Sequence, residues 1–246
     1  MNDGSSRRGV LVPIITTVVI VAVLLALGFW QLQRRADKLA LIATLDERLA
    51  AASVPLPPQA QWEALSPEKD EFRRVTLTGV FDLRDQAQVF ASGSPLRKDV
   101  SGTGVWLFAP LKLAGGDTVV VNRGFVADGQ DATPRYSSDP VTLTGYLRFP
   151  ETPSWLTPHA DRTKRLWFVR DHLAMAQALA WAEPTRVAPF YIDLEAPAPP
   201  SGIPKPGPLQ VSLKNDHLQY AVTWFLLAAA VSIAFAVWLR AARRAV

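Results

Sequence analysis

Two long apolar segments without a charged residue constrain the fold of this 246-residue chain more than any other feature. They run from Val10 to Trp30 and from Ala221 to Leu239. A helix of about 20 apolar residues spans the ~30 Å hydrocarbon core of a bilayer. The residues between the two segments are mostly polar, with ordinary apolar content. The sequence therefore predicts a membrane protein with two transmembrane helices flanking a water-exposed domain.

The charged residues predict how the chain is oriented in the membrane. Of 26 Lys and Arg residues and 22 Asp and Glu residues, five basic ones and one acidic one lie outside the two spans, which leaves 21 of each sign between them. This distribution follows the positive-inside rule and not the footprint of a nucleic-acid-binding protein. We therefore expect both termini in the cytoplasm, the middle of the chain outside it, and no nucleic acid partner. The five basic residues are Arg7, Arg8, Arg240, Arg243 and Arg244.

The first apolar segment resembles a membrane anchor more than a cleaved signal peptide. It is long for a signal peptide, and Ala26-Leu27-Gly28 is only a marginal cleavage site. The start of the chain also lacks the arginine-rich composition of a mitochondrial transit peptide. We therefore expect an uncleaved protein of the bacterial inner (plasma) membrane, with its central domain in the periplasm.

The region between the spans reads mainly as strands. Alternating or continuous apolar runs predict them, and Ala114-Gly115-Gly116 predicts a hairpin between two of them. One amphipathic helix is predicted over Val169–Ala182. The expected fold class is a pair of transmembrane helices flanking an extracytoplasmic α+β domain dominated by antiparallel strands, with a barrel-like sheet as one form. The predicted strands cover residues 72–82, 86–92, 104–113, 117–127, 141–149 and 186–196.

Prolines delimit this domain. Helical spacing of apolar residues continues past the first span until the proline-rich Val54–Pro58, which predicts a helical stalk. Pro197–Pro208 is rich in proline and predicts an extended tether of roughly 35 Å. The predicted parts are a cytoplasmic N-terminus (1–9), a transmembrane helix (10–30), the stalk (31–53), the β-rich domain (54–196), the tether (197–216), a second transmembrane helix (217–239) and a basic cytoplasmic tail (240–246).

Catalytic motifs are missing from the sequence. There is no Gly-x-Ser-x-Gly, His-Glu-x-x-His or phosphate-binding loop, and without cysteine no thiolate can bind a metal. His159 lies in a polar loop and is expected on the surface, and His172, which begins the predicted helix, is expected to be a surface or core polar residue. The sequence therefore gives no support for an enzyme.

A histidine at the edge of the second span is the candidate ligand-binding residue. His217 begins a helical stripe whose small residues allow a flat group or another helix to approach closely. An imidazole, aromatic rings and arginines could provide a haem with an axial ligand, stacking surfaces and partners for its propionates. The stripe comprises His217, Ala221, Trp224, Ala228 and Ser232, and the side chains expected at the same depth are Trp30, Gln31, Arg34 and Arg35.

The same residues also fit a simpler interpretation. Trp30, Tyr220 and Trp224 would form an aromatic belt at the membrane surface, with arginines reaching lipid headgroups. Asn215 or Asp216 would cap the second helix. Physical reasoning from the residues alone favours this interpretation, and the ligand role of His217 stays open at this point.

Five motifs, taken together and in order, resemble the Surfeit-locus family of cytochrome c oxidase assembly factors. The resemblance covers nearly the whole chain, although Phe125 stands where the family usually has tryptophan. The motifs are LGFWQLQRRADKLALI (27–42), FRRVTLTGVFD (72–82), VVVNRGFVA (119–127), FYIDLEAP (190–197) and NDHLQYAVTWF (215–225).

The resemblance implies a non-enzymatic protein that helps mature the haem-bearing catalytic subunit of a haem–copper oxidase. It implies that His217 binds the iron of haem a, held between the two helices near the outer face. Arg34, Arg35 or Arg123 could meet the propionates. Expected partners are the oxidase catalytic subunit, membrane lipid, and as further candidates haem a synthase and other assembly factors. The residues implied in cofactor binding are His217, Trp30, Gln31, Arg34, Arg35, Tyr220, Trp224 and Arg123.

Two competing hypotheses remain at the level of the sequence. A haem-free scaffold would have the same partners but use His217 only as an interfacial residue. An extracytoplasmic sensor or binding module would need a cytoplasmic signalling domain, and only nine residues precede the first span and seven follow the second. The expectation of a sensor is therefore the weaker of the two.

Overall fold

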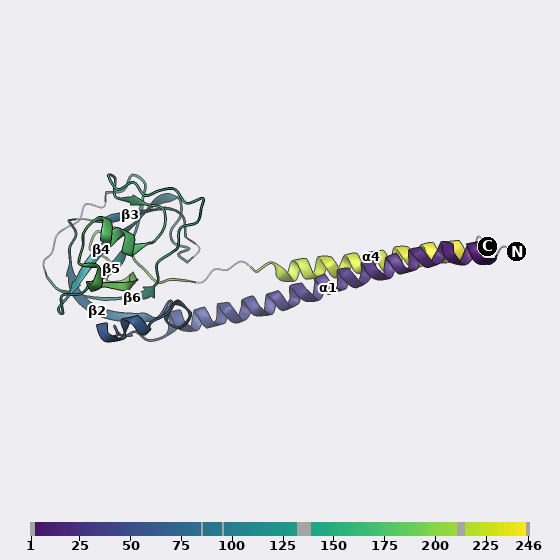
Figure 1. Cartoon of the computed structure of the whole chain (residues 1–246), viewed down its shortest axis with the longest axis horizontal. Coiled ribbons are helices and arrows are strands. Elements are labelled where there is room, and N and C mark those ends of the chain that lie inside the picture. Colours follow the sequence, from purple (N-terminus) through teal and green to yellow (C-terminus); the bar gives the residue numbers. More distant parts are fainter. Residues whose placement is uncertain (1–2, 85, 95, 132–138, 211–214, 245–246) are drawn as a thin grey trace. The chain divides into compact units, whose positions relative to one another are not determined.

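A helix pair and a β-rich domain make up the computed structural model (Figure 1). It describes the chain except residues 1–2, 85, 95, 132–138, 211–214 and 245–246, and it describes side chains from residue 11 onward. The helix unit contains the residues up to Ala43 and those from Leu213, and the domain contains Thr44–Ser212. Parts of the predicted cytoplasmic ends and of the predicted tether, including residues 211–214, lie outside the described residues.

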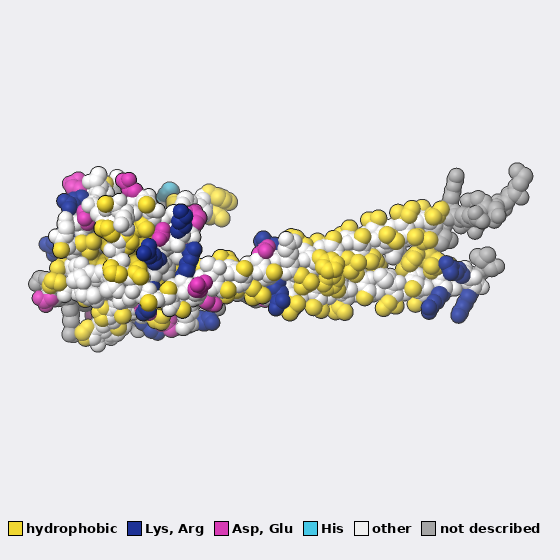
Figure 2. Space-filling view, turned by 90° about the horizontal axis from the view of Figure 1, so that it is seen from below, with side chains coloured by type: hydrophobic (Ala, Val, Ile, Leu, Met, Phe, Trp, Pro, Cys, Tyr) yellow, Lys and Arg dark blue, Asp and Glu magenta, His cyan; other side chains and the backbone are white. Residues whose placement is uncertain are grey.

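The helix unit contains α4 (His217–Arg244) and α1 (Asp3–Ala50) up to Ala43, and the last residues of α1 belong to the domain. Both helices are long and apolar enough to span a membrane, with a mean hydropathy of 2.8 for the first and 2.2 for the second. Figure 2 shows the apolar surface that they present outward, which suits lipid rather than water. The protein is therefore of the membrane type, with two spanning helices flanking a β-rich domain. Helix α1 continues without interruption through the predicted stalk and ends at Ala50, shortly before the prolines.

Strands of the domain close into a barrel. β2 pairs with β6, β6 with β8, β8 with β5, β5 with β4, and β4 pairs back with β2 through residues 111–113 and 79–81. Four of these five pairings are antiparallel, and only β5 and β8 run parallel. The strands are β1 (Val54–Pro55), β2 (Arg74–Phe81), β3 (Ala87–Ser92), β4 (Thr103–Leu113), β5 (Thr118–Ala127), β6 (Val141–Arg148), β7 (Leu166–Trp167) and β8 (Val187–Ala196).

Short elements surround this barrel. β1 extends the sheet beside β2, while β3 and β7 extend it beyond β4. The prediction of a mainly antiparallel, barrel-like domain is therefore confirmed. The short helical elements are the 3₁₀ helices η1 (Gln59–Ala64) and η2 (Pro184–Arg186) and the α-helices α2 (Pro67–Asp70) and α3 (His172–Ala178).

Apolar side chains pack on both faces of the central strands. In β5, Val119 and Val121 belong to one core cluster and Val120 belongs to the other. Trp62 from η1 packs edge-to-face on Phe190 on the first side, and α3 covers the second. Burial on both faces explains why β5 and β8 read as nearly continuous apolar runs and not as alternating ones.

Helix α3 is shorter than the predicted Val169–Ala182. Asp171 caps its N-terminus, because its carboxylate accepts a hydrogen bond from the Ala174 amide. Helical geometry ends by Ala180, which has a φ of 48°. His172, the first residue of this helix, is buried, and His159 is exposed.

The proline-rich segment after β8 differs from the extended tether that was predicted. Lys205 and Phe125 exchange backbone hydrogen bonds of 2.8 and 3.1 Å, so the segment pairs with the end of β5. Pro204, Pro206 and Leu209 are buried in the domain. Up to residue 210 the segment is thus part of the domain, because its prolines cover apolar surface that the sequence alone did not reveal.

Candidate functional site

His217 lies at the first turn of α4, directly after Asn215 and Asp216. The Tyr220 amide donates a hydrogen bond to the Asp216 carbonyl, which closes the first turn. The imidazole is half-buried, and its Nδ1 lies 2.7 Å from Oε1 of Gln31 on α1. Since the amide oxygen can only accept, Nδ1–H is the donor in this contact.

The small-residue stripe of α4 is occupied by α1. Ala221 and Ala228 are almost completely buried within the helix unit. On α1, Gly28 is also buried, and a Cβ added to it would lie 2.5 Å from Cε1 of Phe225. The sequence suggested that either a flat group or another helix could pack on this stripe, and in the structure it is the helix α1 that packs there. The seam at Gly28 and Phe225 is therefore filled by the helices themselves.

The other residues predicted for this site are spread around that end of the unit. Trp30, Arg34 and Tyr220 are exposed on the helix surface, while Arg35 and Trp224 are half-buried. The indole Nε1 of Trp224 is buried and has no hydrogen-bond partner in the described part of the chain. Among the described side-chain hydrogen bonds, the one between His217 and Gln31 is the only one that joins two residues of the predicted site.

Arg123 belongs to the domain, not to the helix unit. It lies on β5, where its Nη1 donates a 2.6 Å hydrogen bond to Oε1 of Gln86 and its guanidinium stands 5.5 Å from the centre of the Phe81 ring. Among the described residues no carboxylate forms an ion pair with it. Burial without a compensating charge lowers the pKa of Arg123 to about 10.

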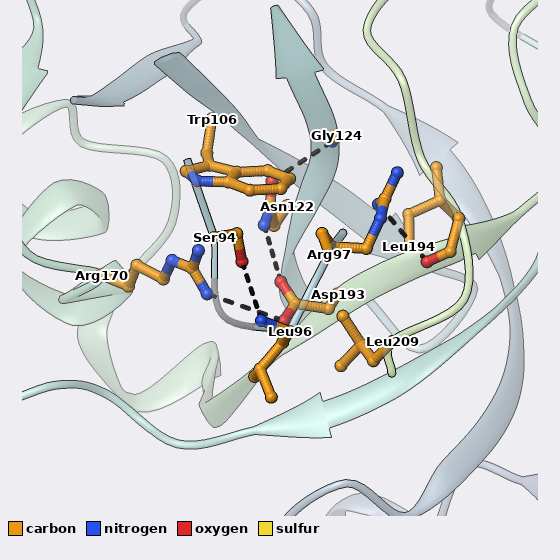
Figure 3. A pocket seen from close by; sticks show the side chains of 11 residues that line it. Ser94, Leu96, Arg97, Trp106, Asn122, Gly124, Arg170, Asp193, Leu194 and Leu209 are labelled. Carbon is orange, nitrogen blue, oxygen red and sulfur yellow. Dashed lines mark hydrogen bonds and ion pairs between the residues drawn. The ribbon is translucent and has the colours of Figure 1, made fainter. Parts of the chain in front are cut away.

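Sequence reasoning missed a buried polar network in the domain, of which Figure 3 shows the part around Asp193 and Asn122. Asp193 of β8 accepts hydrogen bonds from Asn122 at 2.6 Å and from Arg148 at 2.7 Å. Arg148 also donates to Glu71 at 2.6 Å. The side-chain oxygen of Asn122 accepts from the Gly124 amide. The sequence feature that could have revealed this network is a single charged residue inside an apolar strand, such as Asp193 in FYIDLEAP.

This network is closed on itself. Burial alone would lower the pKa of Arg148, but the charges of Tyr191, Asp193 and Glu71 raise it above its ordinary value. The cavity beside Asp193 and Asn122 measures only about 10 Å³, room for no more than one water molecule. The space between Asp193 and Asn122 is therefore too small for a substrate or cofactor.

Metal-binding clusters of three or more His, Asp or Glu side chains do not occur in the part of the chain that the structure describes. A metal held by several protein ligands is thus not supported here. A single axial ligand to a metal that arrives in its own macrocycle needs no such cluster. The imidazole of His217 is half-buried.

Comparison with known proteins identifies the family. The SURF1 family model matches residues 18–229. Surfeit locus protein 1 of Homo sapiens is 33% identical over 84% of this chain and 70% of the human protein. SURF1-like proteins of Drosophila melanogaster and Monosiga brevicollis are 33% and 31% identical, each over 87% of this chain and over 73% and 82% of their own lengths. The resemblance drawn from the five sequence motifs is confirmed, and the chain belongs to the SURF1 family.

Proposed function

We propose that this protein is an assembly factor for a haem–copper cytochrome c oxidase, that it binds haem a at His217, and that it assists haem insertion into the catalytic subunit. Membership of the SURF1 family supports the assembly role. The observation that carries the haem-binding part is the hydrogen bond between His217 Nδ1 and Gln31 Oε1. No catalytic step is assigned to the chain.

The hydrogen bond prepares the imidazole for one ligand. A histidine that binds a metal through one nitrogen usually donates the other N–H to a fixed acceptor, which sets the tautomer and the ring orientation. Gln31 is that acceptor here, because its 2.7 Å contact holds the proton on Nδ1. Nε2 is then the atom available to iron. Bound haem a would supply the iron centre that is delivered to the oxidase.

The surroundings of His217 fit the remaining parts of a haem. Trp30 and Tyr220 present exposed aromatic rings, and Arg34 and Arg35 follow on α1 as cations for propionates. The seam between the helices is closed at Gly28 and Phe225. We therefore modify the expectation of a haem between the helices: the macrocycle lies at the surface end of the helix pair.

We further propose that both termini are cytoplasmic, that the β-rich domain is periplasmic, and that the membrane is the bacterial inner membrane. The basic residues Arg240, Arg243 and Arg244 at the end of α4 support this orientation. The domain would contact the oxidase catalytic subunit, haem a synthase or another assembly factor. His217 would then lie near the outer face, where the hydrophobic tail of haem a can remain in lipid.

The test is the pigment that co-purifies with the full-length protein from membranes. His217→Ala should abolish the haem spectrum while the protein still inserts. Gln31→Leu should weaken haem affinity by about 10–100-fold, the usual effect of losing a partner of a ligating histidine. Gln33→Leu is the matched control, because Gln33 lies on the exposed side of the same turn of α1.

A host unable to make haem a provides the second control. Retention of the full haem spectrum by His217→Ala would contradict the ligand assignment. Equal losses in the Gln31 and Gln33 variants would contradict the role of the hydrogen bond.

A haem-free scaffold is the second candidate function. Close packing of α1 on Ala221 and Ala228 favours it, since the small-residue stripe is explained by the helix pair alone. A haem-free scaffold should be colourless when purified from any host. Oxidase subunits should co-purify with it, and they should still do so with the His217→Ala variant.

A further inference from the structure

The loop between β6 and β7 exposes two adjacent apolar side chains. Trp155 is 91% exposed and Leu156 is 70% exposed, the highest values among the large apolar residues of the domain that the structure describes. An exposed leucine alone would need no explanation, but a tryptophan and a leucine together at a loop tip form a specific apolar feature. We call residues 154–157 the apolar tip.

Hydrogen bonds hold the tip in an outward conformation. The Ser154 amide donates to Oγ1 of Thr157 at 2.9 Å, and the Thr157 amide donates to the Ser154 carbonyl at 3.0 Å. The Leu156 amide donates to Oγ of Ser154 at 3.3 Å. Pro153 and Pro158 flank this turn and restrict the chain on both sides. Because the turn is fixed, Trp155 and Leu156 do not fold back onto the apolar surface beside them.

Basic side chains accompany the tip. Trp155 and Arg162 line the same surface hollow of about 490 Å³, whose floor includes Trp167 and Phe168. Arg162 is exposed, and so is Lys164, which keeps only a 3.6 Å contact with Asp161. Figure 2 shows an apolar projection with Lys and Arg side chains near it on one face of the domain.

A lipid surface fits this combination best. Tryptophan prefers the headgroup level of a bilayer, leucine prefers the acyl boundary, and Lys or Arg side chains bind lipid phosphates. Two side chains offer far less area than the ~800 Å² per partner of a stable protein interface. A bilayer needs no such area, because the domain is covalently joined to two helices that are long and apolar enough to span it.

We propose that the apolar tip inserts Trp155 and Leu156 into the lipid headgroup region of the membrane that holds the helices, with Arg162 and Lys164 contacting lipid phosphates. The domain thereby has a third, reversible attachment to the membrane, which limits its rotation on its two covalent connections. This attachment is independent of haem binding and of oxidase assembly.

The absence of cysteine from the sequence permits a clean test in the full-length protein. Leu156→Cys, labelled with an environment-sensitive fluorophore, is reconstituted in vesicles that contain acyl-chain nitroxide lipids. Ala114→Cys is the matched control, since Ala114 lies exposed at the turn between β4 and β5 and its side chain has no polar group. We expect a blue-shifted emission and strong nitroxide quenching at position 156, and neither effect at position 114.

Neutralising the two basic side chains tests whether they contact lipid phosphates. The double variant Arg162→Gln, Lys164→Gln should reduce quenching at position 156 in vesicles with anionic phosphatidylglycerol, and have less effect in purely zwitterionic vesicles. Equal emission and quenching at positions 156 and 114 in both lipid mixtures would overturn the proposal. So would protection of position 156 that occurs only after purified oxidase is added, because the tip would then be a protein-docking site.

Discussion

Asp193 allows a quantitative test of how the domain is held together. Its two carboxylate oxygens accept from Asn122 and from Arg148, and Arg170 lies at 4.0 Å. Arg148 is only 8% exposed, so solvent cannot replace the lost charge. Asp193→Asn keeps the size of the side chain, removes its charge and replaces one accepting oxygen by an NH2 donor. The buried guanidinium of Arg148 is then left with Glu71 as its remaining carboxylate.

The expected cost follows from this geometry. Removing one partner of a buried ion pair usually costs about 3–5 kcal/mol, and the remaining Glu71 contact argues for the lower end, about 3 kcal/mol. Such a loss is a large share of a typical stability of about 5–15 kcal/mol. With a urea dependence of about 1–3 kcal/mol per molar, the unfolding midpoint should fall by about 1–3 M.

Urea titration of the detergent-solubilised chain, followed by tryptophan fluorescence, measures this shift. Asp82→Asn is the matched control, because Asp82 pairs with Arg84, which is 73% exposed, and such pairs contribute about 0–1 kcal/mol. If both variants lower the midpoint equally, the reasoning that burial makes the Asp193 network strong is refuted.

Two further substitutions probe the domain. Gly124 has a φ of 130°, and an added Cβ would lie 2.4 Å from the Lys205 carbonyl. Gly124→Ala should therefore accelerate hydrogen exchange at the Lys205 and Phe125 amides, whereas Gly129→Ala, with a positive φ but open space, should not. Burial lowers the pKa of His172 to about 4 from an ordinary 6.5, so the unfolded state binds the extra proton first. Stability should be full above pH 6.5 and fall by up to about 3 kcal/mol as the pH drops towards 4. His172→Leu should remove that part of the slope in urea titrations across this range.

The local elements could be predicted because their signals are local. Charge-free apolar length predicted α1 and α4, and alternating or continuous apolar runs predicted the six long strands within one or two residues. Closure of the barrel was less accessible, because Gly79–Phe81 and Leu111–Leu113 pair across about 30 residues with no pattern that fixes their register. The proline-rich segment was misread because composition predicts an extended backbone but not the surface that it covers.

The site shows the same limit. His217 and Gln31 were both predicted as binding residues, yet their 2.7 Å contact joins positions 186 residues apart. Arg123 was predicted from a motif shared with the family, and motif membership does not say whether a guanidinium meets a ligand or packs on Phe81. The Asp193 network was missed because a charged residue in an apolar strand indicates that a buried partner exists but does not identify which residue that partner is.

Closure of the barrel also decides how the domain can recognise other chains. A closed ring of strands leaves few free backbone N–H and C=O groups, which disfavours docking of a partner by strand addition to the ring. The outermost strands of the sheet are β1 and β7, each two residues long, and β1 contains Pro55. Under the proposed assembly role, such short edges would limit promiscuous strand pairing with other chains, and selectivity would come from side chains.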